Sequence, residues 1–400
     1  MSKRALLIMI SASVIILLSM GLRNSFGLFL RPVSDALLLN VQVFSFAIAI
    51  QNLLWGLSQP FAGAIAEKYG SGKVIAVAGL LHVLGLIILA NADSAWDLYT
   101  GAGLIIGIAG SGCTFAVLLA VVARNVSAKH RSTALGITAA CGTLGQITMA
   151  PATQYLLSDF GWSVAFIVLA ALLALIVPLA AMLTGKSEAA PGTDIAGADT
   201  LSGALAEVAR HRGYILLNLG FFVCGFHVLF IMAHFPNFLV SSGFPTWLPV
   251  YALSTIGVTN LISTLIAGWL GDRYSKKYLL STLYFLRAIV FAVFLMVPLT
   301  TASVLIFSGA IGSLWLATVP LTSGLVGQIF GVRFLATLFG IVFLSHQLGS
   351  FAAVWLGGYV FDKTGSYDLV WQISVVLGIV AAILHLPIAE RPLIREAAAA

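Results

Sequence analysis

Two arginines, Arg23 and Arg287, stand inside long apolar stretches of this 400-residue sequence. The 14 acidic residues all lie in polar stretches or close to the ends of the apolar ones. A guanidinium in hydrocarbon costs at least about 2.5–3.5 kcal/mol on membrane-insertion scales, so it marks a structural or a binding role. No acidic residue lies inside an apolar stretch, so the two arginines predict an electropositive site for a small organic anion. The carboxylate of such an anion can accept two parallel N–H bonds from one guanidinium.

Other polar side chains in the apolar stretches are candidates to line the same site: Asn24, Asn52, Asn260, His346 and Gln347. A neutral histidine can bind a substrate or take up a proton, so His346 and, more weakly, His227 are candidates for proton coupling. Alternative roles stay open. Each histidine could be a satisfied core residue, Arg23 could extend to the outer headgroups, and Arg287 could bind backbone carbonyls.

Motifs of catalysis are missing from the sequence. It has no HExxH, no P-loop and no Ser-His-Asp spacing in a plausible site, and its three cysteines are isolated in apolar runs. We therefore expect no enzymatic activity, no cofactor and no metal.

The composition identifies an integral membrane protein, because 60% of the residues are hydrophobic and only 8% are charged. It excludes a disordered chain, a disulfide-rich secreted scaffold and a nucleic-acid binder. Since a membrane-spanning helix needs about 20 mostly apolar residues, the sequence predicts an all-α protein with twelve spans, near 6–29, 43–66, 74–91, 98–122, 134–157, 163–183, 214–239, 247–270, 279–298, 303–327, 337–359 and 370–387.

The basic residues predict the orientation of these spans. Of the 20 lysines and arginines, two lie within spans and two, Arg31 and Lys363, fall on the far side, which leaves 16 on the side of the N-terminus. The positive-inside rule then predicts a multi-pass protein of the cell membrane with both termini in the cytoplasm. The single long polar stretch divides the chain into residues 1–183, a cytoplasmic linker over 184–213 with a short surface helix near 202–210, and residues 214–400.

The two halves repeat each other. Gly63, Glu67, Lys68 and Tyr69 follow the second span, and Gly268, Asp272, Arg273 and Tyr274 follow the eighth span, 205 positions later. At an offset of 204, Gly136, Gly145 and Gly161 correspond to Gly340, Gly349 and Gly365. At the offset of 205, Arg287 corresponds to His82, another polar residue in an apolar stretch. The repeat predicts two pseudo-symmetric bundles of six helices.

The loop after the second span resembles the G-x-x-x-D-R-x-G-x-x-[RK] signature of the major facilitator superfamily. It appears here as Gly63, Glu67, Lys68, Gly70 and Lys73, and the second copy has Ser275 in place of the inner glycine. The resemblance implies a transporter whose halves rock about a site near mid-membrane, with the loops acting in gating and structure. The acid can cap a neighbouring helix, and the bases can pair with carboxylates across the seam.

The first span resembles, more narrowly, the bacterial branch that holds monocarboxylate transporters and oxalate:formate antiporters. The similar segments are Gly21–Phe29 with Pro32, Ser58–Pro60, and Gly161–Trp162 with Ala165–Phe166. That branch usually carries an anion-binding arginine on the eighth helix, where this sequence has Asn260 and Thr264, and the arginine stands on the ninth. The resemblance implies a monomeric transporter of a small organic anion, with proton symport or anion exchange. An exporter of larger amphipathic compounds is the alternative.

Overall fold

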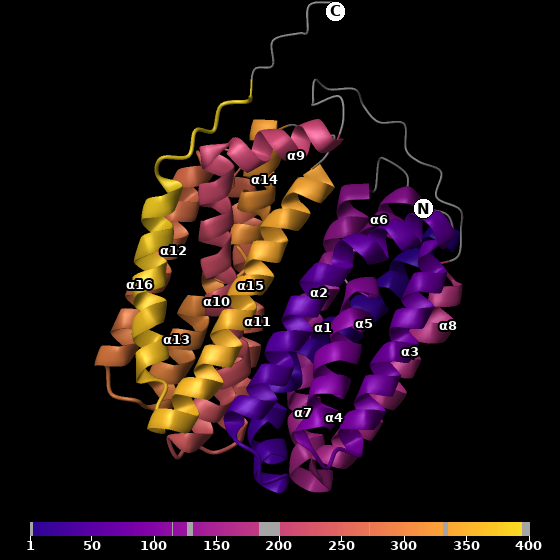
Figure 1. The fold of residues 1–400 in the computed structure, drawn as a ribbon, viewed down its shortest axis with the longest axis vertical. Coiled ribbons are helices and arrows are strands. Elements are labelled where there is room, and N and C mark those ends of the chain that lie inside the picture. Colours follow the sequence, from indigo (N-terminus) through magenta and orange to yellow (C-terminus); the bar gives the residue numbers. More distant parts are fainter. Residues whose placement is uncertain are drawn as a thin grey trace, which may run out of the picture.

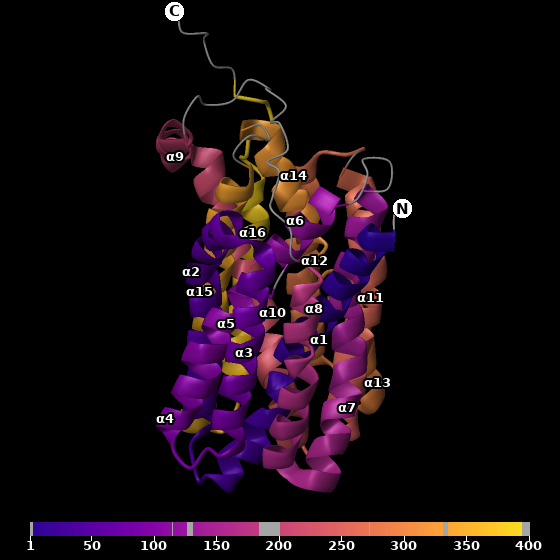
Figure 2. The ribbon, with the colours of Figure 1, turned by 90° about the vertical axis from the view of Figure 1, so that its right-hand side faces the viewer.

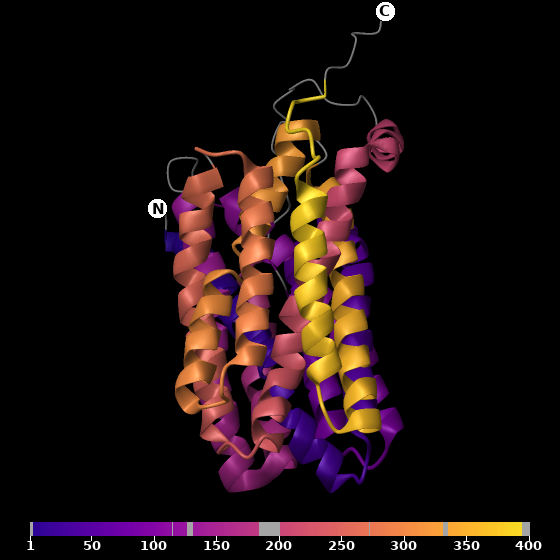
Figure 3. The ribbon, with the colours of Figure 1, turned by 90° about the vertical axis from the view of Figure 1, so that its left-hand side faces the viewer.

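The computed structural model describes residues 3–113, 115–125, 131–183, 201–271, 273–330 and 335–393. Within this part of the chain the elements are helices and turns, with no strand. Helices of the first half form one bundle and helices of the second half form another beside it (Figure 1). Seen from either side, the helices of both bundles run roughly along one direction, as expected for spans of one membrane (Figures 2 and 3).

The first bundle is built from nine helical segments. They are α1 (Lys3–Ala36), α2 (Val41–Tyr69), α3 (Ser71–Ala90), α4 (Ala95–Leu98), the π-helical η1 (Tyr99–Ile105), α5 (Ile106–Gly112), α6 (Phe115–Asn125), α7 (Arg131–Ala174) and α8 (Ile176–Ala181). The fourth span is assembled from α4, η1, α5 and α6.

The second bundle follows the short helix α9 (Leu201–Arg210), which lies across one end of the molecule (Figure 1). Its helices are α10 (Arg212–Ser241), α11 (Trp247–Gly271), α12 (Lys276–Met296), α13 (Thr301–Ser313), α14 (Thr318–Phe330), α15 (Leu335–Thr364) and α16 (Asp368–His385). The tenth span is interrupted between α13 and α14.

Eleven described helical segments are long and apolar enough to cross a membrane. One of them, Ile137–Ala181, has 45 residues, which is about 68 Å of helix and roughly twice a bilayer core. The chain turns within it at Gly161, where φ is 79°. Residues with a side chain rarely adopt that conformation. The segment therefore holds two spans, and the predicted architecture of twelve helices in two six-helix bundles is confirmed.

Backbone conformation also explains the repeated glycines. Gly365 has φ of 70° between α15 and α16, which matches its repeat partner Gly161. In the signature loop, Gly70 has φ of 97° and joins α2 directly to α3. Ser275, its counterpart between α11 and α12, has φ of −60°. The second copy of the loop therefore has no need of a glycine at this position.

The signature residues lie at one end of the molecule. Gly63 and Lys68 are in the last turns of α2, and Lys73 is in the first turn of α3. Gly268 is in α11, and the guanidinium of Arg273 stacks on Trp269 at 4.0 Å. The side chain of Glu67 and the whole of Asp272 lie outside the described residues.

The described cations are distributed unevenly along the helices. The start of α1, the C-terminal end of α16 and α9 are at the same end of the molecule (Figure 1). We call this end the basic face, because it carries helix-end cations that include Lys3, Lys68, Lys73, Arg210, Arg212, Arg273, Lys276 and Lys277. The other end, here the opposite face, carries Arg31 and Lys363.

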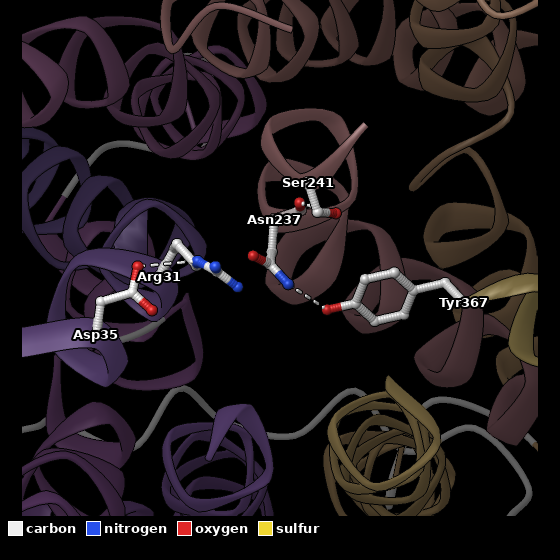
Figure 4. A network of polar contacts seen from close by, with 5 residues as sticks. All are labelled: Arg31, Asp35, Asn237, Ser241 and Tyr367. Atoms are coloured by element: carbon white, nitrogen blue, oxygen red, sulfur yellow. Dashed lines mark hydrogen bonds and ion pairs between the residues drawn. The ribbon is translucent and has the colours of Figure 1, made fainter. Parts of the chain in front are cut away.

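Three polar contacts lie at the opposite face. Arg31, near the end of α1, forms an ion pair with Asp35 at 2.9 Å, and its guanidinium extends towards the amide of Asn237 on α10 (Figure 4). Asn237 donates to the hydroxyl of Tyr367 at 2.7 Å, and Ser241 donates to the carbonyl of Asn237 (Figure 4). Polar side chains of both bundles therefore converge at this end.

A carboxylate ties the bundles together at the same face. Asp362 on α15 accepts the backbone N–H groups of Val41 at 3.1 Å and Gln42 at 2.7 Å, so it caps the first turn of α2 from the other bundle. Other hydrogen bonds and ring contacts between bundles lie near mid-span, as far as Trp55 on Phe343. From that level to the basic face, none is present among the described residues. The structure is held closed at the opposite face.

We expect Asp362→Asn to shift the protein towards a state open at the opposite face. Hydrogen bonds to a charged group contribute about 1.5–3 kcal/mol, and an amide keeps only part of that, so the population ratio should change roughly tenfold. Ser45, which is fully buried beside this cap, reports the change when replaced by cysteine and treated with an impermeant maleimide. Labelling should rise in Asp362→Asn and not in Asp368→Asn, an exposed carboxylate at the same face. Equal labelling in both would contradict the role of the cap.

Candidate functional site

Arg23 lies midway along α1, and its guanidinium is held by two side chains of α2. Its Nη2 donates to Oδ1 of Asn52 at 3.0 Å, and the guanidinium stacks on Trp55 with 4.4 Å between its carbon and the ring centroid. Asn52 is oriented for this by its own Nδ2, which donates to the carbonyl of Ile48 at 2.8 Å. The amide oxygen therefore faces the arginine, and the guanidinium plane is fixed by the indole.

Most hydrogen-bonding capacity of Arg23 is left over. A guanidinium has five N–H groups, and the described contacts occupy one of them, at Asn52. The Nε of Arg23 is buried and has no hydrogen-bond partner among the described residues. Part of the side chain stays accessible. An unmet buried donor costs about 1–3 kcal/mol, which favours a bound acceptor at this position.

The two bundles meet at the residues next to this arginine. Nε2 of Gln347 on α15 donates to the carbonyl of Asn52 at 2.9 Å. On the other side of Arg23, Nδ2 of Asn24 donates to Oε1 of Gln146 at 3.4 Å, and Gln146 donates to the carbonyl of Leu253 on α11 at 3.2 Å. Arg23, Asn24, Asn52 and Gln347 from the predicted site are thus brought to one level of the seam between the bundles.

Arg287 lies elsewhere, within the second bundle, and its side chain is fully buried. Its Nε donates to the carbonyl of Leu314 at 2.8 Å, its Nη2 donates to the carbonyls of Leu314 and Trp315, and its Nη1 contacts the sulfur of Cys224 at 3.6 Å. These carbonyls belong to the break between α13 and α14, where the helix leaves them without partners. All three nitrogens of the guanidinium have partners. Of the two roles considered for Arg287, this favours the binding of backbone carbonyls over the binding of an anion.

Asn260 serves the same break in the tenth span. Its Oδ1 accepts the backbone N–H of Leu316 at 3.0 Å and the hydroxyl of Thr264 at 3.2 Å. The side chain is 3% exposed. Arg287 and Asn260 together therefore supply the donors and the acceptor that the interrupted backbone lacks, and neither is hydrogen-bonded across the seam between the bundles.

The two histidines predicted for proton coupling both lie in the second bundle. His346 on α15 has its Nδ1 3.0 Å from Oε1 of Gln347 and its ring stacked on Phe343. His346 therefore directly precedes Gln347, the residue that makes a hydrogen bond across the seam. His227 on α10 has its Nε2 2.9 Å from the carbonyl of Ser374 on α16, inside the bundle. His346 stays close to the candidate site, and His227 does not.

Sequence reasoning did not select four residues that lie around Arg23 or its neighbour Asn24. Trp55 and Gln51 are on α2, Gln146 is on α7, and His82 is on α3. Gln51, Asn52 and Trp55 lie within one helical turn, a spacing that places them on neighbouring faces of a helix, and this was the available signal. His82 is far from Arg23 in sequence, and no pattern links the two. No group of metal-ligating side chains is found among the described residues.

Comparisons with known proteins agree with the fold. Residues 6–263 and 251–399 match the family model of the Major Facilitator Superfamily. Monocarboxylate transporter 11 of Mus musculus is 27% identical over 88% of this chain and 80% of its own length, and the uncharacterised MFS-type transporter YcxA of Bacillus subtilis is 24% identical over 94% and 93%. Among solved structures, an inward-facing, unoccupied bacterial homologue of the human lysosomal transporter Spinster has a TM-score of 0.76, with 15% identity over 96% of this chain and 97% of that chain.

Proposed function

The chain belongs to the major facilitator superfamily, and we propose that it is a secondary transporter that carries a small organic anion, of the monocarboxylate class, across the cell membrane by alternating access. It is a multi-pass membrane transporter and not an enzyme. One observation supports the anionic substrate above all. The described hydrogen bonds of Arg23 use one of its five N–H groups, and the partner is an amide and not a carboxylate. Asn52 and Trp55, which hold this guanidinium, both contact the second bundle.

The substrate carboxylate binds Arg23 in this proposal, through two parallel N–H bonds from one edge of the guanidinium. Trp55 covers one face of the arginine, and Asn52 holds one Nη2 proton, so the approach of the carboxylate is restricted in direction. Asn24 and Gln347 supply polar groups on either side of it. A small organic acid suits this site because the polar groups are few and all lie at one level.

Alternating access follows from where the contacts between bundles are. A site at the seam is exposed to one side when the contacts on that side are broken. The hydrogen bonds at the opposite face, from the start of α2 to Asp362, are intact, and the described residues between Trp55 and the basic face make no hydrogen bond or ring contact across the seam. With the basic face in the cytoplasm, as the distribution of lysine and arginine predicts, this is a state that exchanges substrate with the cytoplasm.

Uptake into proteoliposomes tests the proposed function. Labelled lactate, pyruvate, formate and oxalate should be offered with and without a pH gradient, and at least one monocarboxylate should accumulate or exchange. Rhodamine 6G transport in the same vesicles addresses the alternative, an exporter of larger amphipathic compounds. Transport of the dye together with inactivity towards all four acids would overturn the proposal.

A further inference from the structure

His82, on α3, lines the same small cavity as Arg23. The cavity has about 20 Å³ of room for the centre of a water molecule, and its polar lining consists of Ser19, Arg23, Gln51, Asn52, Trp55 and His82. About 10–15 Å³ of such room is enough for one water molecule. The cavity therefore connects an imidazole of the first bundle to the proposed anion site.

The hydrogen bond of His82 to its own helix fixes its neutral form. Nδ1 is 3.0 Å from the carbonyl of Ala78, one turn earlier. A carbonyl can only accept, so Nδ1 carries the proton and Nε2 is left as an acceptor. The side chain is 3% exposed. A buried imidazole is thus held with its basic nitrogen unprotonated.

Two donors that line this cavity lack acceptors. Nε of Arg23 and Nε2 of Gln51 are buried, and neither has a hydrogen-bond partner among the described residues. Buried polar groups of this kind are usually satisfied by internal water, which makes about three hydrogen bonds. One water molecule that accepts from Arg23 and Gln51 and donates to Nε2 of His82 meets that requirement.

We propose that His82 is the proton-binding residue that couples anion transport to proton movement, linked to Arg23 through a water molecule in this cavity. This inference rests on the proposed function. A proton on Nε2 gives His82 a positive charge beside the positive charge of Arg23, and the two repel each other. A substrate carboxylate on Arg23 removes that repulsion, so proton and anion bind together, and each favours the other to the same extent.

The surroundings of His82 support this assignment. The elements packed against α3 are α2, α4, η1, α5, α6, α7 and α8, and none of their described carboxylates, lysines or arginines lies at mid-span. The other titratable groups on these elements or at their ends are Tyr69 at the end of α2, Cys141 and Tyr155 on α7, Tyr99 at the far end of η1, and Cys113 directly after α5, whose thiol donates to the carbonyl of Ile75 at 3.7 Å. The charge that His82 faces is therefore that of Arg23 and of whatever anion Arg23 binds.

The chain provides a matched control for His82. His385 on α16 is also buried, and its Nδ1 is 2.7 Å from the carbonyl of Ala381, again one turn earlier. It lies in the second bundle, where its ring stacks on Tyr284. A substitution at His385 therefore reproduces the loss of a buried imidazole and its helix contact without touching the cavity of Arg23.

The test measures labelled lactate in proteoliposomes in two modes, uptake driven by a pH gradient and exchange at equal pH, with pyranine inside to record proton entry. In His82→Gln and His82→Asn, the stimulation of uptake by the gradient and the lactate-dependent proton entry should vanish, while exchange remains. His385→Gln should keep all three. Gradient-driven uptake that persists in a His82 variant overturns the inference. Wild-type protein that neither exchanges nor accumulates any monocarboxylate would instead overturn the proposed function.

A calorimetric measurement keeps the inference open to refutation if both His82 variants fail to fold. Lactate binding to the wild-type protein in detergent should take up a proton, so the heat of binding should change with the ionisation enthalpy of the buffer. A heat that is the same in all buffers would overturn proton coupling through a residue of the site. Folding of each variant is checked by gel filtration and by its melting temperature.

Discussion

Replacing Arg23 by glutamine should weaken the binding of a small carboxylate by about 2–5 kcal/mol, which corresponds to a dissociation constant roughly 30- to 5,000-fold higher. The magnitude is that of a desolvated charge pair, because the guanidinium is half-buried and stacked on Trp55. Folding should be affected little, since the described contacts of Arg23 include one hydrogen bond, to Asn52. Arg23→Lys keeps the charge but not the planar fork of N–H groups. The affinity of this variant should therefore fall between those of the wild type and of Arg23→Gln.

Titration calorimetry with lactate or pyruvate measures this effect directly on purified protein. Arg31→Gln is the matched control, because Arg31 is on the same helix but is paired with Asp35 at the opposite face. The control should bind as the wild type does. A folded Arg23→Gln protein with wild-type affinity would show that the anion binds elsewhere.

Replacing Arg287 by glutamine should instead reduce the amount and stability of folded protein. The change removes the donors from the carbonyls of Leu314 and Trp315 at the break between α13 and α14. An unmet buried acceptor costs about 1–3 kcal/mol, so the two carbonyls together cost about 2–6 kcal/mol. That is a large part of the 5–15 kcal/mol that typically stabilises a folded domain.

The melting temperature and the yield of monodisperse protein measure the effect at Arg287. Protein that does fold should bind lactate as the wild type does, because Arg287 makes no described hydrogen bond across the seam. Arg273→Gln, which removes an exposed guanidinium from Trp269, should change stability by less than about 0.5 kcal/mol. An Arg287→Gln protein with unchanged melting and lost binding would assign Arg287 to the anion site.

The fold could be predicted almost entirely from the sequence, because the physics that sets it is local. A hydrocarbon core demands long apolar helices, and the twelve apolar stretches correspond to the twelve spans. The helix ends differ by a few residues, since hydropathy does not reveal where a helix continues into the headgroup region. The predicted fifth and sixth spans leave residues 158–162 as their junction, and the positive φ of Gly161 explains the repeated glycine there.

The site could be predicted in part. Arg23, Asn24, Asn52 and Gln347 were identifiable because polar groups in apolar helices are costly and need a reason. The same argument also selected Arg287 and Asn260, whose hydrogen bonds go to the backbone at the break near Leu314. Nothing in the sequence marks that break, so their role there could not be predicted. The cavity that joins His82 to Arg23 depends on how α1, α2, α3 and α5 are arranged around it. Such packing between distant segments is not encoded in any local pattern.

Counterflow of labelled lactate tests the central claim, that a carboxylate is recognised by its charge at Arg23. Proteoliposomes loaded with unlabelled lactate and held without a pH gradient or membrane potential should transiently accumulate the label. Excess external pyruvate should abolish this accumulation, whereas excess lactamide, which matches lactate in size but has no charge, should leave it unchanged. Absence of counterflow, or equal inhibition by lactamide and pyruvate, would contradict the account.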